Sequence, residues 1–179
     1  LDGQQDLSAW ALGIAKFAEG GGIDAKQSGN LLLASQSQGL VKQTASIAEN
    51  VPGMRAAGGM GNDSINDMMA LFAFATQKGG DTAGSSTTTA ISQLIKNMMT
   101  RGDELNEITG AGITDEMGGL ERLQRVAGRL GSGELSNEQV GKLYSRSAKG
   151  AARTQILFGM AQDPEGLNAA LDVMRSDGV

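Results

Sequence analysis

Apolar side chains recur along the chain at intervals of three and four residues, with polar side chains between them. This spacing places the apolar residues on one face of an α-helix. No segment alternates apolar and polar residues for long enough to predict a strand. The clearest helical segments are 7–18, 65–76, 90–99, 120–130 and 167–174. We therefore predict an all-α fold, a compact bundle of about eight short helices joined by Gly-rich turns.

Glycine clusters mark where the helical segments end. The chain has 27 glycines and only 2 prolines. Glycine is common just beyond the last turn of a helix, so this distribution favours many short helices over one long rod. We expect one helical domain over residues 1–179. Because the chain begins at Leu1 rather than at Met, we also expect it to be a fragment of a longer chain.

The segment 65–76 differs from the others because it is apolar nearly all round. A helix of this kind belongs in the middle of a domain, so we predict that this is the central helix. Gly79 and Gly80 are expected to end it. Capping patterns also precede several segments: Asn62 or Asp63 before the central helix, Ser64-x-x-Asp67 as a loose relative of a capping box, Ser136-x-x-Gln139, and Asp163-Pro164.

Composition restricts both the core and the available chemistry. Aromatic residues make up 3% of the chain, so the core has to be built from Leu, Ile, Ala and the nine Met. The chain has no Cys and therefore no disulfide or thiolate chemistry. It also has no His, which removes the most common general base and the most common neutral metal ligand.

The charge balance bears on possible partners. The formal net charge is −5 and no basic run occurs, so we expect neither nucleic acid nor an anionic membrane as a direct partner. No apolar stretch approaches the roughly 18 residues that a membrane-spanning helix needs.

The stretch GGDTAGSSTTTAISQLIKNMM, residues 79–99, looks at first like a phosphate-binding loop. Such a loop needs a preceding strand and the pattern G-x-x-x-x-G-K-[ST]. Gly79 and Gly84 have the required spacing, but serines follow where the phosphate-binding lysine would stand. The sequence GMGNDS at 59–64 likewise lacks the third glycine of a dinucleotide-binding fingerprint. We therefore expect no cofactor-binding residue.

The hydroxyl-rich run from Ser85 to Thr89 could supply a nucleophile, but a serine needs a base to activate it. Without His, that base would be a lysine or a carboxylate. Ser92 and Lys96 are four residues apart, whereas serine/lysine acyl enzymes use Ser-x-x-Lys. Ser and Thr gather at helix starts because their hydroxyls bond to the backbone. A capping and first-turn role is therefore the preferred interpretation.

Two pairs of adjacent acidic residues, Asp103–Glu104 and Asp115–Glu116, could be considered for glycoside hydrolysis. Neighbouring residues on a helix do not face one site, and we place both pairs at helix starts, where the helix dipole favours them. Arg122, Arg125 and Arg129 share one helix face, which we expect to be solvated. We therefore expect no catalytic and no metal-ligating residue.

The order of these features from about residue 50 onwards resembles the core domain of phage tail tape measure proteins. AAGGMGNDSINDMMALFAFATQKGG is similar to the family's small-residue helix, polar cap and Leu/Ala-rich helix ending in glycine. GGDTAGSSTTTAISQLIKNMMTRGDELNEITGAGIT resembles a Gly-Thr start, an apolar helix, a short polar helix and a Leu-Gly-Ile corner. The family usually has Leu or Ala where this chain has Ser-Ser-Thr-Thr-Thr.

The rest of the resemblance lies nearer the end of the sequence. DEMGGLERLQRVAGRL is like the family's Asp-x-x-Gly-x-Leu with an amphipathic helix, LFGMAQ is similar to its Phe-Gly turn, and EGLNAALDVMRSDGV looks like its final helix. On this basis we expect N-terminal helices in residues 1–49 and a tape-measure-like core in residues 50–179.

The resemblance implies a structural phage or prophage protein and not an enzyme. It implies roles in tail length determination, tail assembly and genome ejection, assembly in the host cytoplasm and a final place in the lumen of the virion tail. The implied partners are tail tube proteins, tail chaperones and other copies of the chain. Two alternatives remain: a generic bacterial helical interaction domain, and a peptidoglycan hydrolase module, although the Glu-Ser and Gly-Leu-Met-Gln signatures of lytic transglycosylases are absent.

Overall fold

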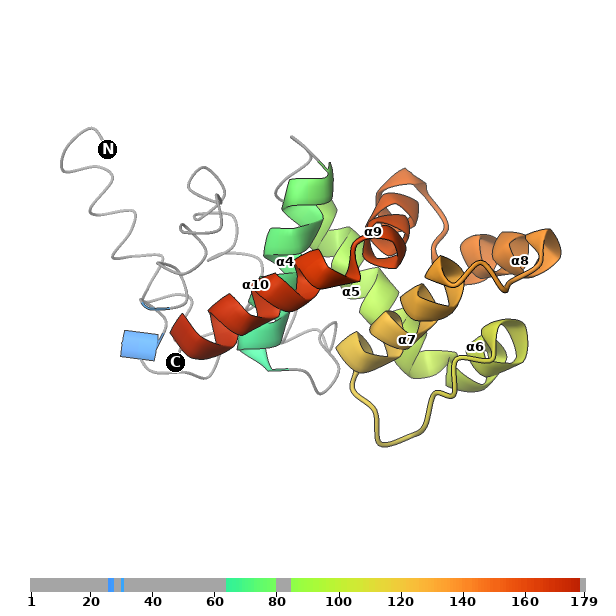
Figure 1. Ribbon diagram of the computed structural model, residues 1–179, viewed down its shortest axis with the longest axis horizontal. Coiled ribbons are helices and arrows are strands. Elements are labelled where there is room, and N and C mark those ends of the chain that lie inside the picture. The colour runs from blue at the N-terminus through green and yellow to red at the C-terminus, as the bar shows by residue number, and fades with distance from the viewer. Residues whose placement is uncertain (1–25, 28–29, 31–63, 80–84, 178–179) are drawn as a thin grey trace.

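The computed structural model describes residues 26–27, 30, 64–79 and 85–177. These described residues contain no strand, so the predicted all-α class is confirmed (Figure 1). The predicted helical segment 7–18 lies outside the described residues. The helices whose bounds the structure gives are α4 (Ile65–Gly79), α5 (Ser85–Thr100), α6 (Gly102–Thr109), α7 (Gly119–Gly131), α8 (Asn137–Ser147), α9 (Ala151–Gln162) and α10 (Pro164–Asp177).

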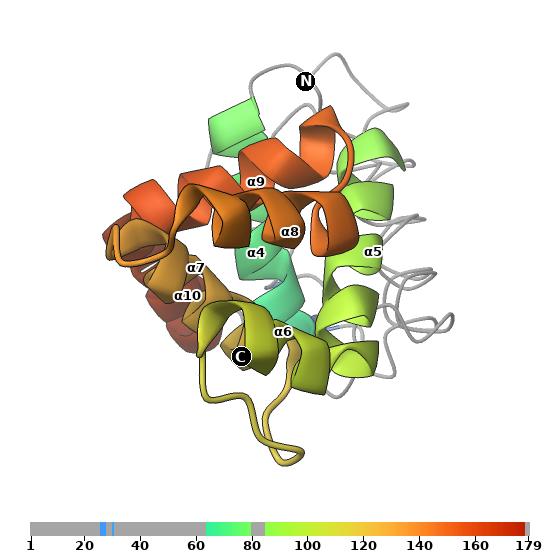
Figure 2. The ribbon, with the colours of Figure 1, turned by 90° about the vertical axis from the view of Figure 1, so that its right-hand side faces the viewer.

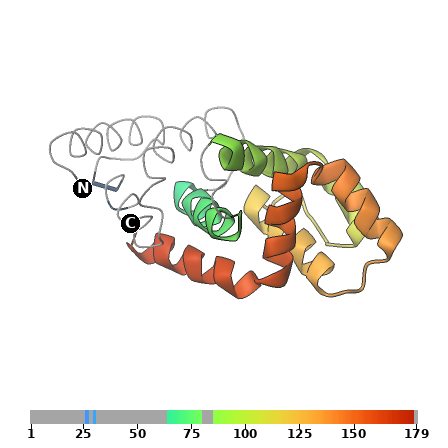
Figure 3. The ribbon, with the colours of Figure 1, turned by 90° about the horizontal axis from the view of Figure 1, so that it is seen from above.

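Helix α4 is the central helix, as predicted from its apolar pattern. Ten of its residues, Ile65 and Met68 to Thr76, are buried, and they cover more than one side of the helix. Figure 3 shows α4 nearly end-on, with α5 on one side and α10 on the other. The helix ends at Gly79, also as predicted. A helix that is apolar all round can be stable in water only when its neighbours cover it on several sides.

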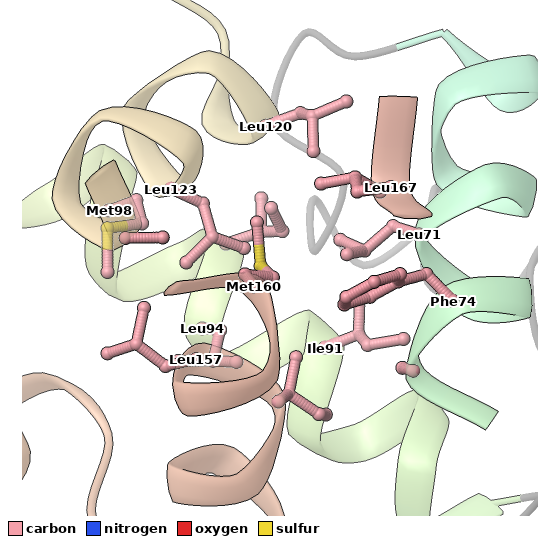
Figure 4. Packing of buried hydrophobic residues seen from close by; sticks show 14 of the residues in the cluster. Leu71, Phe74, Ile91, Leu94, Met98, Leu120, Leu123, Leu157, Met160 and Leu167 are labelled. Atoms are coloured by element: carbon pink, nitrogen blue, oxygen red, sulfur yellow. The ribbon is translucent and has the colours of Figure 1, made fainter. Parts of the chain in front are cut away.

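Aliphatic and methionine side chains from all seven described helices, α4 to α10, meet in one hydrophobic core, part of which Figure 4 shows. Phe74 of α4 and Met160 of α9 lie in its middle, and both are almost fully buried. Because few aromatic residues are available, unbranched and branched aliphatic chains fill the space between the helices. The other labelled members are Leu71 from α4, Ile91, Leu94 and Met98 from α5, Leu120 and Leu123 from α7, Leu157 from α9 and Leu167 from α10.

Helix α10 runs in the opposite direction to α4, and polar contacts hold the pair at both ends. At the start of α4, the Arg175 guanidinium donates to both carboxylate oxygens of Asp67, at 2.8 and 3.2 Å. At the end of α4, Lys78 Nζ lies 2.7 Å from a carboxylate oxygen of Asp163, the residue before α10. Apolar packing between these two ion pairs buries Leu167 and Met174.

The ends of the helices show which capping predictions hold. Ser136 and Gln139 form a full capping box at α8: Gln139 N donates to Ser136 Oγ, and Ser136 N donates to Gln139 Oε1. Asp163 caps α10 by accepting from the backbone N–H of Gly166 at 3.0 Å. At the start of α4, Ser64 Oγ accepts from Asp67 N at 3.2 Å, which agrees with the predicted Ser64-x-x-Asp67 pattern. The other predicted caps, Asn62 and Asp63, lie outside the described residues.

Helices α6 and α8 lie together at one end of the described helices, at the right of Figure 1 and on the side that faces the viewer in Figure 2. The Gln139 side chain donates from Nε2 to the carbonyl oxygen of Ile108, and Arg146 forms an ion pair with Glu104 at 2.8 Å. Between α6 and α7 the chain turns at Gly110, whose φ of +64° is left-handed and strained for any residue with a side chain. A glycine at this helix end agrees with the sequence analysis, in which glycine clusters mark where the helical segments end.

Candidate functional site

The hydroxyl-rich run lies in the first turn of α5, which begins at Ser85. This confirms the first-turn interpretation. Thr87 is buried, whereas Thr89 is exposed. Of the two glycines that have the spacing of a phosphate-binding loop, Gly79 is the last residue of α4 and Gly84 lies outside the described residues, as do residues 59–63 of the dinucleotide-like stretch.

The two acidic pairs occupy different environments. Asp103 and Glu104 lie in the first turn of α6, as predicted, and Glu104 is paired with Arg146. Asp115 and Glu116 are exposed in a turn before α7, which begins only at Gly119. The helix-start prediction was therefore wrong for this second pair. Between the acidic pair and the helix, Met117 is buried and Gly118 has an extended backbone. Because an extended residue cannot belong to a helix, α7 begins after Gly118 and not at the acidic residues.

The prediction that the three arginines of α7 are solvated was wrong for Arg122. Its side chain is only 5% exposed. The guanidinium donates to three backbone carbonyls: from Nε to Met117 at 3.0 Å, from Nη1 to Met98 at 3.2 Å and from Nη2 to Asp115 at 3.4 Å. It therefore ties the end of α5 to the segment that leads into α7, and its charge is balanced by carbonyl dipoles instead of a carboxylate.

The other two arginines of this face are more accessible. Arg125 is exposed and lies 3.8 Å from Glu121, one turn earlier on the same helix. Arg129 donates from Nε to the carbonyl oxygen of Thr109 at 2.8 Å and also pairs with Glu134. Two of the three arginines therefore hold the α6–α7 connection in place by bonding to its backbone. This assigns them a structural role that the spacing of the residues alone did not reveal.

An apolar cleft, which we call the α7–α9–α10 cleft, lies between α7, α9 and α10. Its volume is about 340 Å³. None of the side chains that line it is charged, and the lining combines glycines and alanines with larger apolar side chains, two amides and a hydroxyl. The lining residues are Gln124, Ala127, Gly128, Gly131, Ser132, Met160, Ala161, Pro164, Leu167 and Asn168.

Two further hollows are polar. One, of about 390 Å³, lies beside the Asp67–Arg175 ion pair and is also lined by Ser64 and Glu121. The other, of about 350 Å³, lies at the start of α6, and its lining includes Arg101, Asp103, Asp115 and Arg122. Among the described residues, no three acidic side chains gather where they could hold a metal ion.

Phe158 is exposed on the outer face of α9. Its side chain is 50% exposed, and it is the one large hydrophobic residue in the described part of the chain with that much exposure. The resemblance implied a turn at Phe158 and Gly159, but both residues lie inside α9, so this expectation was wrong. Gly159 stands where the helix passes the side chain of Lys78, whose Cγ would lie 3.3 Å from an added Cβ.

None of the described helices is long and apolar enough to span a membrane. Comparisons of this chain with protein-family models, with characterised proteins and with solved structures gave no significant match.

Proposed function

We propose that this chain is a globular helical domain of a phage or prophage tail tape measure protein, and that its role is structural. The main support is the order of features along the sequence. A buried Leu/Ala-rich helix, α4, is followed by the hydroxyl-rich start of α5, the short polar helix α6 and a left-handed glycine corner at Gly110. An amphipathic helix, α7, then follows. The resemblance to the family rests on this same order.

In this proposal the domain takes part in tail length determination, tail assembly and genome ejection. Its partners would be tail tube proteins, tail chaperones and other copies of the chain, and it would lie in the tail lumen after assembly in the host cytoplasm. The net charge of −5 is consistent with this place, because an acidic chain would pass DNA without adhering to it.

A direct test is to look for the chain in tailed particles. Particles are purified from the source cells after induction, and their proteins are digested and identified by mass spectrometry. We expect peptides from residues 85–177 together with those of the tail tube protein, and in several copies per particle. Purified tails that contain tube protein but no such peptides would contradict the proposal.

A second experiment tests the role in assembly. The coding region for residues 64–177 is removed in frame from the parent gene, and the particles are examined by electron microscopy. We expect tails that are absent or of altered length, while heads form in normal numbers and act as the control. Tails of unchanged length and number would contradict the proposal.

A further inference from the structure

Helix α8, at the outer end of the described helices, is docked through little apolar surface (Figure 1). Between residues 134 and 149, the buried apolar residues are Leu143 and Ala148, and Tyr144 packs partly against the core. Helix α7 is of similar length and buries four apolar residues, which are Leu120, Leu123, Val126 and Ala127. Because a helix in a protein is stabilised mainly by burial of its apolar face, α8 is held less firmly than α7.

Polar side chains from α5 and its end also attach α8 to the domain. Asn97 donates from Nδ2 to the Ser147 carbonyl at 3.1 Å, and Arg101 donates from Nη1 to the Arg146 carbonyl at 2.8 Å. Water can replace both partners of each bond when α8 moves away, so the net stabilisation from these bonds is modest. The Ser147 side chain opposes docking, because it is buried and its hydroxyl has no hydrogen-bond partner among the described residues.

Two glycines with positive φ bracket this segment. The φ angle is +74° at Gly133 and +102° at Gly150, and the ψ angle of 152° at Gly150 completes a conformation that is essentially restricted to glycine. An added Cβ would meet no atom within 4 Å at either position, so the backbone conformation, not lack of space, requires glycine there. Both glycines can change conformation at little steric cost and can therefore act as hinges.

The helices around α8 have attachments of their own. Helices α7 and α9, which flank the segment in sequence, pack directly against each other. Helix α6 buries Leu105, and the Arg129 guanidinium holds its end by donating to the Thr109 carbonyl. The connection from α6 to α7 also buries Ile113 and Met117. These contacts do not involve α8, so α8 can move away without separating the other helices.

We propose that residues 134–149 open as one unit about Gly133 and Gly150 while the rest of the described domain stays folded. Opening exposes Leu143 and the side of α6 that α8 covers, where Gln139 bonds to the Ile108 carbonyl in the closed form. The domain thus has a built-in conformational device that uncovers apolar surface without global unfolding. The inference rests on contacts within the domain, so its failure would leave the tail proposal standing.

The test is amide hydrogen exchange of the purified chain, measured by mass spectrometry at several low urea concentrations. Amides in residues 137–147 should exchange at least about tenfold faster than those in α4, α5 and α9. Their rates should rise together with urea, because a cooperative opening exposes surface, whereas fraying of single residues does not. Exchange in α8 that is as slow as in α4, or that does not respond to urea, would overturn the inference.

A core variant distant from α8 shows whether the opening is separate from global unfolding. Ile91→Val, in the first half of α5, should accelerate exchange in α4 roughly two- to tenfold by weakening the core. It should leave exchange in α8 unchanged, because the closed and open forms contain the same altered core. If exchange in α8 accelerates as much as in α4, α8 exchanges only through global unfolding and the inference is wrong.

Gly150→Ala tests the hinge. Alanine is strained in the closed conformation and relaxed in the open one, so exchange in α8 should accelerate about tenfold or more. Gly128→Ala is the matched control, because its added Cβ also meets nothing within 4 Å but its backbone is helical. This control should not change exchange in α8, and circular dichroism should show that each variant is folded. The inference fails if Gly150→Ala has no effect, or if Gly128→Ala has an equal one.

Discussion

A Cβ atom added at Gly131 would lie 2.5 Å from the carbonyl oxygen of Ala161, a distance that no real contact of this type allows. Gly131 is the last residue of α7, and Ala161 is the penultimate residue of α9. The absence of a side chain at Gly131 therefore sets how closely these two helices approach. The wall of the α7–α9–α10 cleft depends on the same approach, since both residues line it.

The Gly131→Ala variant should be destabilised. The new methyl group faces backbone atoms, which can yield only if a helix shifts, and overpacking of this kind costs about 1–3 kcal/mol. Gly128→Ala is the matched control on the same helix, because its Cβ meets nothing within 4 Å. That control should gain about 0.5–1 kcal/mol from helix propensity. Urea unfolding monitored by circular dichroism measures both, and equal midpoints for the two variants would refute the prediction.

The Arg122→Met variant should also lose stability. Methionine fills part of the space but cannot donate to the carbonyls of Met98 and Met117, which then remain buried without these bonds. We expect a loss of about 2–4 kcal/mol in the free energy of unfolding. Arg125→Met, on the exposed side of α7, should change stability by no more than about 0.5 kcal/mol. If the two variants unfold at the same denaturant concentration, Arg122 does not have the structural role described above.

Several features of the fold could be predicted because the sequence pattern determines them locally. Helix α4 was identified as central because apolar residues cover it nearly all round, and such a helix is stable in water only when neighbours bury it on several sides. The capping box at α8 involves Ser136 and Gln139, three residues apart, so no tertiary information was needed.

The role of Arg122 depended on contacts that are distant in sequence. One of its partners, the Met98 carbonyl, is 24 residues away and reaches the guanidinium only when α5 and α7 pack together. The position of Arg122 in the sequence nevertheless indicated that it could be buried. Arg122 lies four residues before the buried Val126 and therefore on the same face of α7. The exposure of Phe158 could not have been predicted from the sequence. The residues on either side of it, Leu157 and Gly159, do not indicate whether Phe158 lies on the buried or the exposed face of α9.

The capping box predicts a modest and local effect at α8. Ser136→Ala removes the acceptor for Gln139 N and should lower the free energy of unfolding by about 1 kcal/mol. Ser145→Ala, on the exposed side of the same helix, is the control, because its hydroxyl only bonds back to the carbonyl of Lys142. Thermal unfolding compares the two. A larger loss for Ser145→Ala than for Ser136→Ala would show that the cap does not stabilise α8.

The contact between α4 and α10 should make the domain sensitive to acid. The pKa of Asp163 is lowered from its ordinary value of 3.8, first by the hydrogen bond from Lys78 and then by the bond from the Gly166 N–H. A group whose pKa is lower in the folded than in the unfolded state contributes stability above its unfolded pKa. That contribution is lost as the pH falls through the folded pKa, so the loss should occur below about pH 4.

Asp163→Asn separates the charge of this residue from its capping role. Asparagine still caps α10 but forms no ion pair with Lys78, so the variant should be less stable at pH 7 than the wild type. Because it cannot titrate, its denaturation midpoint should fall less than that of the wild type between pH 6 and about pH 3. The comparison requires urea unfolding curves at each pH. If both proteins lose stability in parallel, other carboxylates such as Glu138, whose pKa is also lowered by its bond to Lys142, account for the acid sensitivity.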